Sequence, residues 1–262
     1  MLNSLFLLAI GFGVGMFGTM IGAGGGFILV PVLLLLYPKD SPETTTAISL
    51  TVTFANSFSG SVAYARMKRI SYRYGLIFAG ASIPGAVLGA LTTQYIKRGT
   101  FDLIFAIVMI MAAAYIFLRA PRESHLDPGE PIRLSPGNVA IGIAISLVVG
   151  YCSILLGIGG GIIHVPALVS ILGFPVHAAT ATSHFILALM TGTGTLVHIV
   201  SDGYREGAGR AITIAIGALA GAQLGALMST HVKGRSIIRA LAVGLALVGV
   251  RLLILVFSVY GR

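Results

Sequence analysis

Neutral hydrogen-bond donors gather in two otherwise apolar stretches of the chain. In the first, Ser49, Thr53 and Asn56 follow at i, i+4 and i+7, so they share one face of a helix. In the second, Ser183 and His184 stand side by side. Hydroxyl and amide donors can bind an oxyanion without trapping it by charge, although they also bond to their own helix or hold helices together. The residues predicted to bind an anion here are Ser49, Asn56, Ser183 and His184.

Two glycine clusters are the second feature with chemical potential. The sequence Gly-Ala-Gly-Gly-Gly fills 22–26, and Gly-Ile-Gly-Gly-Gly fills 157–161. Each cluster lies inside an apolar stretch of 35 residues, at 3–37 and 138–172. A continuous helix of that length would reach roughly 52 Å, against a hydrocarbon core of about 30 Å. Glycine weakens a helix and lets the backbone turn, so each stretch is predicted to form a hairpin of two helical arms.

A broken helix presents free N–H groups where its second arm begins, here near Phe27 and Ile162. The helix dipole favours an anion at that end, and irregular backbone at membrane depth is tolerated only inside protein or beside a watery cavity. Two such ends meeting near the midplane would make an anion site without fixed charge. The alternative is that the glycines serve close helix packing. The backbone positions predicted to bind the anion are Gly24, Gly25, Gly26, Gly159, Gly160 and Gly161.

Several other chemistries are disfavoured by the residue types. Apart from Asp102, no predicted span holds an acid, so a carboxylate proton relay has no members. The six histidines lack the i, i+4 spacing of a zinc site, and Cys152 is the single cysteine, so neither a metal nor a cofactor is expected. Ser183 and His184 are neighbours and project about 100° apart on a helix, which is poor geometry for a catalytic dyad.

Composition places these residues in a bilayer. Of 262 residues, 56% are hydrophobic and only 10% are charged, whereas soluble proteins carry about 25% charged residues. Mean hydropathy is +0.97. A water-soluble enzyme is therefore excluded, and no nucleic-acid partner is expected. The chain is predicted to be an all-α integral membrane protein with the lipid bilayer as its surroundings.

Charges divide the chain into spans. The candidate spans are 3–37, 45–65, 74–95, 101–118, 138–172, 181–200, 210–229 and 237–258. The first has no Lys or Arg before Lys39 and is expected to be a retained span, with a cleavable signal peptide disfavoured. The segment 119–136 is rich in proline and mixed charges, which is typical of a linker. The predicted organisation is a first repeat at 1–118, a polar linker at 119–136 and a second repeat at 137–262.

The repeats are indicated by matches at nearly constant offset. Besides the glycine clusters, Val30-Pro31 recurs as Val165-Pro166, and Thr-Ala-Ile-Ser at 46–49 recurs as Thr-Ala-Thr-Ser at 180–183. A Gly-x-x-x-Gly pattern at 85–89 also recurs at 221–225. Such small-residue faces can serve packing within the fold or a homodimer. Each repeat is predicted to hold one glycine-broken hairpin and three transmembrane helices.

A hairpin plus three helices gives each half an odd number of crossings, which requires inverted halves. A single overlong helix would give parallel halves instead. Counting Lys and Arg by the positive-inside rule gives ten inside and six outside for both arrangements, so the rule predicts only that the loop 66–69 is cytoplasmic. Inverted halves therefore rest on the glycine break.

Two polar residues within apolar runs need their own interpretation. Arg251 could pair with a substrate anion, but a tilted helix would let it snorkel to the interface, and this second reading is favoured. Gln223 replaces the apolar Val87 of the first half and indicates a hydrogen bond inside the bundle.

Duplicated halves that each open with G-x-G-G-G and a proline five residues on, followed by Thr-Ala-x-Ser and a later Gly-x-x-x-Gly, resemble the TauE/SafE sulfite exporter family. The resemblance runs from about Leu5 to Phe257. It implies export of sulfite or a related sulfur-containing anion, such as a sulfonate, across the cytoplasmic membrane. The positions that match the glycine and proline motif are Gly22, Gly24, Gly25, Gly26, Pro31, Gly157, Gly159, Gly160, Gly161 and Pro166. Ser49 and Ser183 match the Thr-Ala-x-Ser motif.

The residues and the resemblance lead to one expectation by separate routes. The protein is predicted to be a secondary transporter that carries a small anion by alternating access about a midplane site. Two alternatives stay open at this point. One is a channel-like permease for another small solute, and the other is an intramembrane enzyme.

Overall fold

The computed structural model describes residues 4–118, 132–201, 207–232 and 234–260. Within these ranges the chain is helical, with no strand, which confirms the predicted all-α fold. The helices are α1 (Ser4–Ile21), α2 (Gly26–Leu36), α3 (Pro42–Arg66), α4 (Tyr72–Thr93), α5 (Arg98–Leu118), α6 (Pro136–Leu155), α7 (Gly161–Ser170), α8 (Val176–Val200), α9 (Ala208–Ser229) and α10 (Gly234–Tyr260). Residues 119–131 of the predicted linker lie outside the described part. Its last residue, Pro136, is the first residue of α6 and follows the N-cap Ser135.

Five described helices are long and apolar enough to cross a membrane, namely α1, α4, α6, α8 and α9. The central helix α3 is 25 residues long but carries the polar face identified above, which lowers its hydropathy. Serine and threonine side chains on α3 are largely buried against other helices, where lipid does not reach them. The polar residues of α3 therefore lie inside the bundle.

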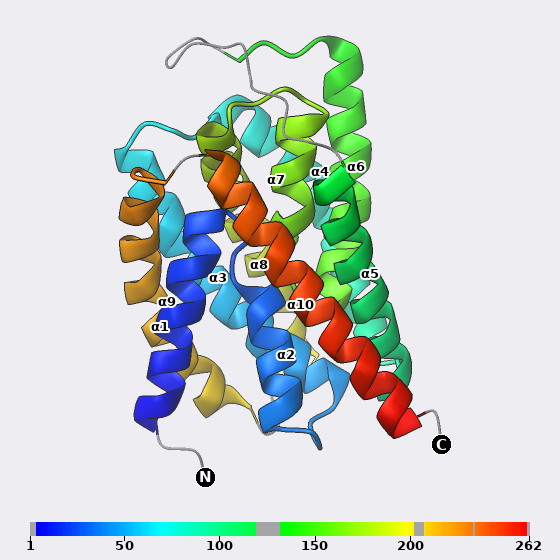
Figure 1. The fold of residues 1–262 in the computed structure, drawn as a ribbon. Helices are drawn as coiled ribbons and strands as arrows, with labels where there is room; N and C mark the ends of the chain where they lie inside the picture. Colours follow the sequence, from blue (N-terminus) through cyan, green and yellow to red (C-terminus); the bar gives the residue numbers. More distant parts are fainter. Residues whose placement is uncertain (1–3, 119–131, 202–206, 233, 261–262) are drawn as a thin grey trace.

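Both long apolar stretches are broken at the glycine clusters, as their length predicts. The first separates into α1 and α2, and the second into α6 and α7; α2 and α7 are only 11 and 10 residues long. In Figure 1 the α1–α2 hairpin opens at the end of the molecule where the N-terminus lies, and the α6–α7 hairpin opens at the opposite end. Helices of this length reach about 15 Å, half the hydrocarbon core, so neither α2 nor α7 is long enough to cross a membrane.

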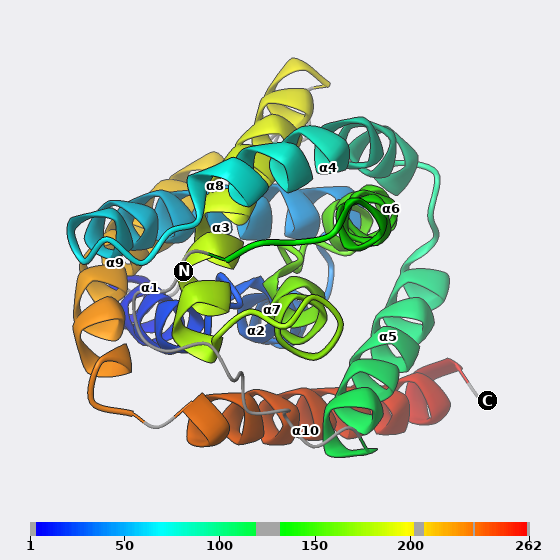
Figure 2. The same ribbon diagram turned by 90° about the horizontal axis from the view of Figure 1, so that it is seen from above.

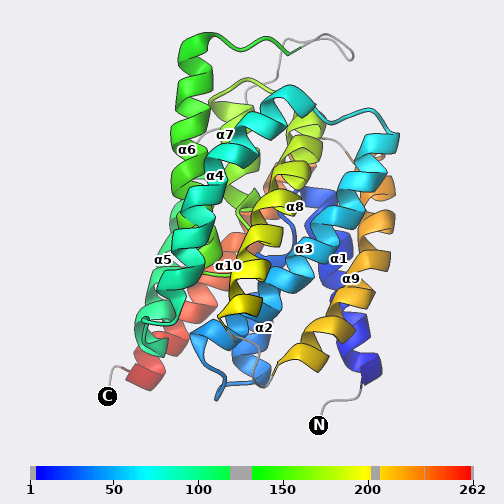
Figure 3. The same ribbon diagram turned by 180° about the vertical axis from the view of Figure 1, so that it is seen from behind.

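The contacts between helices occur in equivalent pairs, in which each helix is replaced by its counterpart from the other half. Helix α1 packs along α9, and α6 packs along α4; α3 contacts α9 and α8 contacts α4. Helices α3 and α8 cross each other at the centre, and α5 packs on α10 (Figure 3). These directions and contacts are those expected of inverted halves, and the duplication itself stays a prediction.

Glycines on α1, α4, α6 and α9 let these pairs approach until backbone meets backbone. A Cβ on Gly85 would meet the Leu147 carbonyl of α6, and one on Gly221 would meet the Phe12 carbonyl of α1. Both Gly-x-x-x-Gly faces are therefore used within the fold. They are not available for the homodimer that they were also considered to serve, so a homodimer stays a prediction without their support.

Candidate functional site

The two glycine turns have the same backbone conformation. Gly22, Gly24 and Gly25 have φ of 85°, 78° and 84°, and Gly157, Gly159 and Gly160 have φ of 71°, 82° and 90°. This left-handed region is costly for residues with a Cβ, by about 1–2 kcal/mol each. Three such residues within four positions reverse the chain between the two arms of each hairpin. The glycines are therefore required by the turn itself.

The tips of the two hairpins touch at the centre of the bundle, where Figure 2 shows α2 and α7 surrounded by other helices. A Cβ on Gly26 would lie 2.6 Å from the Gly157 oxygen, and a Cβ on Gly161 would meet the Gly22 oxygen. Gly26 and Gly161 are the first residues of α2 and α7. The positive ends of these two half-helices thus lie close together, and the residues inside the turns, Ala23 and Ile158, are fully buried.

Ser49 and Ser183 lie beside the turns, each bonded to the turn of the other half. The Ser49 hydroxyl donates to the Gly157 carbonyl at 2.6 Å, and the Ser183 hydroxyl donates to the Gly22 carbonyl at 3.1 Å. A serine has one proton to donate, so neither hydroxyl is free to donate to an anion in this conformation. Their geometry ties each crossing helix to the opposite hairpin.

Asn56 and His184 belong to one buried hydrogen-bond network around the first turn. The Asn56 amide donates to the Gly24 carbonyl at 2.9 Å, and the Thr19 hydroxyl donates to the Asn56 amide oxygen at 2.9 Å. His184 Nε2 lies 3.2 Å from the Thr19 hydroxyl oxygen. Since the single Thr19 proton is directed to Asn56, His184 donates from Nε2. The network holds the first turn through three neutral side chains, one each from α1, α3 and α8.

Sequence reasoning missed Thr19 and Tyr64. The Tyr64 hydroxyl donates to the Thr19 carbonyl at 2.8 Å, and its ring lies edge-on to the His184 ring with centroids 5.7 Å apart. Thr19 carried a usable signal, because it is the single polar side chain of α1 after Ser4 and stands just before the glycine cluster. Tyr64 lies at the far end of α3 and gave none.

The donors without a partner at the junction are not the predicted Ser49 and Ser183. Neither α2 nor α7 has a side-chain cap at its N-terminus. Thr53 and Ser57 have buried hydroxyls without a hydrogen-bond partner. A Cβ on Gly26 would lie 2.8 Å from the Thr53 hydroxyl oxygen, and one on Gly24 would lie 3.2 Å from that of Ser57. Thr53 also approaches Gly159 of the second turn, so it lies between the two hairpins.

The described ion pairs lie at the outer end of α2 and not at this junction. Arg98 pairs with Asp102 at 3.2 Å and donates to the Asp40 carbonyl, while Arg210 pairs with the Asp40 carboxylate at 2.8 Å. These pairs hold the outer end of α2, because Arg98 also lies 3.4 Å from the Leu34 carbonyl. Among the described residues no group of three His, Cys, Asp or Glu could hold a metal ion.

The two isolated polar residues of the apolar runs are also located. Arg251 is exposed on α10, and its snorkelling to the interface stays a prediction. Gln223 donates to the Ser59 carbonyl at 2.8 Å and contacts the Ser59 hydroxyl at 2.7 Å. The predicted hydrogen bond inside the bundle is confirmed, and it joins α9 to α3.

Two half-helices that enter a helical bundle from opposite sides and meet at a buried, uncharged junction define a polytopic membrane protein of the transporter class. The sequence profile described as "Sulfite exporter TauE/SafE" matches residues 7–252. The chain therefore belongs to this family, as the resemblance of its glycine motifs implies.

Similar proteins share this assignment. The chain is 32% identical to the probable membrane transporter protein YunE of Bacillus subtilis (strain 168), over 96% of this chain and 98% of that protein. It is 27% identical to the probable membrane transporter protein MJ0441 of Methanocaldococcus jannaschii, over 75% and 72% of the two chains. It is 26% identical to the probable membrane transporter protein YfcA of Escherichia coli (strain K12), over 92% and 89%. No solved structure matches the chain significantly. The protein is a multi-pass transporter of the cytoplasmic membrane and not an enzyme.

Proposed function

We propose that this transporter exports sulfite, or a related small sulfur-containing anion, by alternating access about the junction of α2 and α7. The observation that carries the proposal is the meeting of two uncapped helix N-termini inside the bundle. Each N-terminus has the equivalent of about half a positive charge and unpaired N–H groups. Two of them directed at one point favour an anion there.

The side chains at the junction suit an oxyanion with several acceptor oxygens. Thr53 and Ser57 each have a hydroxyl proton without an acceptor. Such neutral donors bind an oxyanion more weakly than Arg or Lys would, so it can leave again. The family name points to sulfite, which has three oxygens and one to two negative charges near neutral pH.

Export needs no carboxylate relay if the membrane potential drives it. A cell interior negative by about 100 mV favours the exit of an anion by about 2.3 kcal/mol per charge. The acidic side chains of the described ion pairs, Asp40 and Asp102, lie at the outer end of α2 and would not repel the anion at the junction.

Alternating access would act on the contacts between the hairpins. The bonds from Ser49 to Gly157 and from Ser183 to Gly22 cross between the halves. Each would have to break when a tip moves, at a net cost of about 0.5–1.5 kcal/mol per bond. The buried tips describe a conformation closed around the junction, which suits a carrier better than an open pore.

Sulfite flux in proteoliposomes with and without an imposed potential tests this proposal. We expect saturable sulfite flux that speeds up when the side of exit is made positive. The same flux at all potentials would contradict electrogenic export, and absence of flux for sulfite, thiosulfate and sulfoacetate would contradict the substrate class. Turnover far above carrier rates would contradict alternating access.

A further inference from the structure

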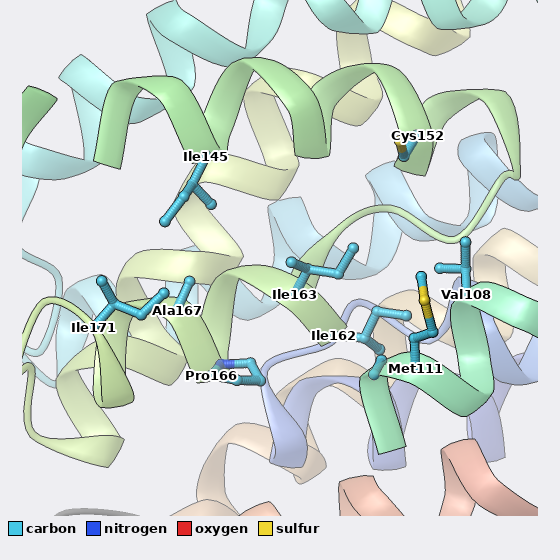
Figure 4. Close-up of a pocket in the computed structure, with 10 residues that line it drawn as sticks. Val108, Met111, Ile145, Cys152, Ile162, Ile163, Pro166, Ala167 and Ile171 are labelled. Carbon is cyan, nitrogen blue, oxygen red and sulfur yellow. The ribbon is translucent and has the colours of Figure 1, made fainter. Parts of the chain in front are cut away.

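A pocket separate from the junction lies between α5, α6 and α7. Its volume is about 450 Å³, and its lining is apolar apart from the thiol of Cys152. Figure 4 shows Val108 and Met111 of α5 facing Ile162 and Ile163 of α7 across it, with Cys152 above them on α6. An apolar cavity does not hold water well, because water needs polar partners. The pocket therefore suits an apolar ligand.

The pocket opens toward the lipid-facing surface and ends beside the hairpin tip. Met111 is 61% exposed and Ile171 is 39% exposed, whereas Ile162 is fully buried. Ile162 follows Gly161, the first residue of α7. The pocket thus extends from the surface to the start of α7. It runs along the α6–α7 hairpin, which opens at the end of the molecule opposite the N-terminus (Figure 1).

The equivalent place beside α2 is covered with protein. Counted from the first residues of α10 and α5, Gly244 and Val108 hold the same position, and Phe27 and Ile162 are both second residues of their half-helices. A Cβ on Gly244 would lie 3.5 Å from the Phe27 ring, so α10 packs directly on α2. Beside α7, Val108 and Ile162 instead line the open pocket. The outer face of α7 lacks part of the cover that α2 has.

The lining and the opening of the pocket indicate which component of a bilayer it would bind. The lining is apolar and Met111 at its mouth is 61% exposed, so the expected occupant is apolar and enters from the lipid side. A lipid acyl chain is narrow and apolar, and in a bilayer acyl chains would surround the exposed side of Met111. We propose that one acyl chain of a membrane phospholipid binds between α5, α6 and α7 and packs on the outer face of α7.

Photocrosslinking in liposomes tests this binding on the full chain. The probe is phosphatidylcholine with a diazirine near the middle of one acyl chain, and adducts are located by peptide mass spectrometry. We expect adducts on Ile163 and Ala167 of α7, at a yield comparable to that on Val148, which faces lipid on α6. Yields on α7 no higher than on the fully buried Met109 would overturn the proposal.

A matched pair of variants on α5 shows whether the adducts arise in the pocket. Ala112 lines the pocket and Ala114 is exposed on the same helix. We expect Ala112→Phe to remove the α7 adducts and Ala114→Phe to leave them, with the Val148 yield unchanged in both. Ala112→Leu, which adds less volume, should reduce them partly and replaces Ala112→Phe if that variant does not fold. Persistence of the α7 adducts in the filled variants would contradict binding in the pocket. Neither outcome depends on what the protein transports.

Discussion

The first and second glycine turns have the same backbone but opposite surroundings. Thr19, Asn56 and His184 contact the first turn, and the residues at the equivalent offsets of 134–135 are Ile154, Met190 and Leu50. Those three apolar residues pack together in one buried cluster. Even the contacts correspond, because Gly60 packs on His184 and Thr19, whereas Gly194 packs on Ile154 and Leu50.

This difference separates the roles of the two hairpins. Moving the first turn would break buried hydrogen bonds, and a buried polar group left unpaired costs about 1–3 kcal/mol. Moving the second turn would break the bond from Ser49 to Gly157 and would otherwise shift apolar contacts that can form again elsewhere. We infer that the α1–α2 turn is the fixed half of the junction and the α6–α7 turn the half that moves. Three comparisons between equivalent positions and one pair of substitutions at His184 test this view.

The largest difference is expected between Gly25→Ala and Gly160→Ala. Both residues have left-handed φ, so both variants carry that cost. A Cβ on Gly25 would lie 2.8 Å from the Val14 carbonyl oxygen, part of the α1 backbone, whereas the nearest atom to one on Gly160 is the flexible Met190 methyl at 2.7 Å. Gly25→Ala should lower the free energy of unfolding by about 1–3 kcal/mol more than Gly160→Ala. Equal thermal stability of the two variants in detergent would contradict the fixed first turn.

The next largest difference is expected between Asn56→Leu and Met190→Leu. Asn56→Leu leaves the Gly24 carbonyl and the Thr19 hydroxyl without their partner, at a cost of about 1–3 kcal/mol. Met190→Leu conserves volume and should cost less than about 1.5 kcal/mol. Denaturant titration of both purified variants measures this difference. A smaller loss for Asn56→Leu than for Met190→Leu would show that the network does not hold the first turn.

A smaller effect is expected at His184, which contributes one hydrogen bond to Thr19. His184→Leu should cost about 0.5–1.5 kcal/mol and slow sulfite flux, because Thr19 loses a donor. His184→Gln keeps an N–H donor and should restore most of the stability and flux. If both variants behave alike, the histidine acts through ring packing on Tyr64 instead.

The smallest effect concerns the outer ends of the two half-helices. The Asp40–Arg210 ion pair lies beside α2, whereas the segment after α7 is held by Phe174, which packs edge-on to Tyr74 with centroids 6.0 Å apart. Asp40→Asn should lower stability by at most about 1 kcal/mol, and less at high salt. Phe174→Leu should show no dependence on salt. Melting curves of both variants at low and high salt measure this difference. The same salt dependence in both variants would contradict it.

Much of this architecture follows from the sequence. A 35-residue apolar stretch is too long for one crossing, and the glycine cluster inside it marks the break, so both hairpins were predictable. The polar face of α3 and the pair Ser183-His184 were also predictable, and the structure brings all of them to the turns.

The bonds made by these side chains were not predictable. Whether Ser49 donates to a ligand or to the Gly157 carbonyl depends on how α3 crosses α8, which no local pattern encodes. Thr19 joins the site because α1 packs beside α3, and the pocket at Val108 exists because α5 stands away from α7. These features arise from tertiary packing between segments far apart in the chain.

The most direct test of the account compares sulfite binding to Thr53→Val and Thr191→Val. Both changes remove one hydroxyl at constant shape beside the Gly159 turn. The Thr53 hydroxyl has no partner, whereas the Thr191 hydroxyl already donates to the Leu187 carbonyl of its own helix at 2.6 Å. If the anion binds at the junction, Thr53→Val should weaken sulfite binding about tenfold, or about 1.4 kcal/mol, and Thr191→Val should leave it unchanged. Unchanged affinity in Thr53→Val would contradict an anion site between α2 and α7.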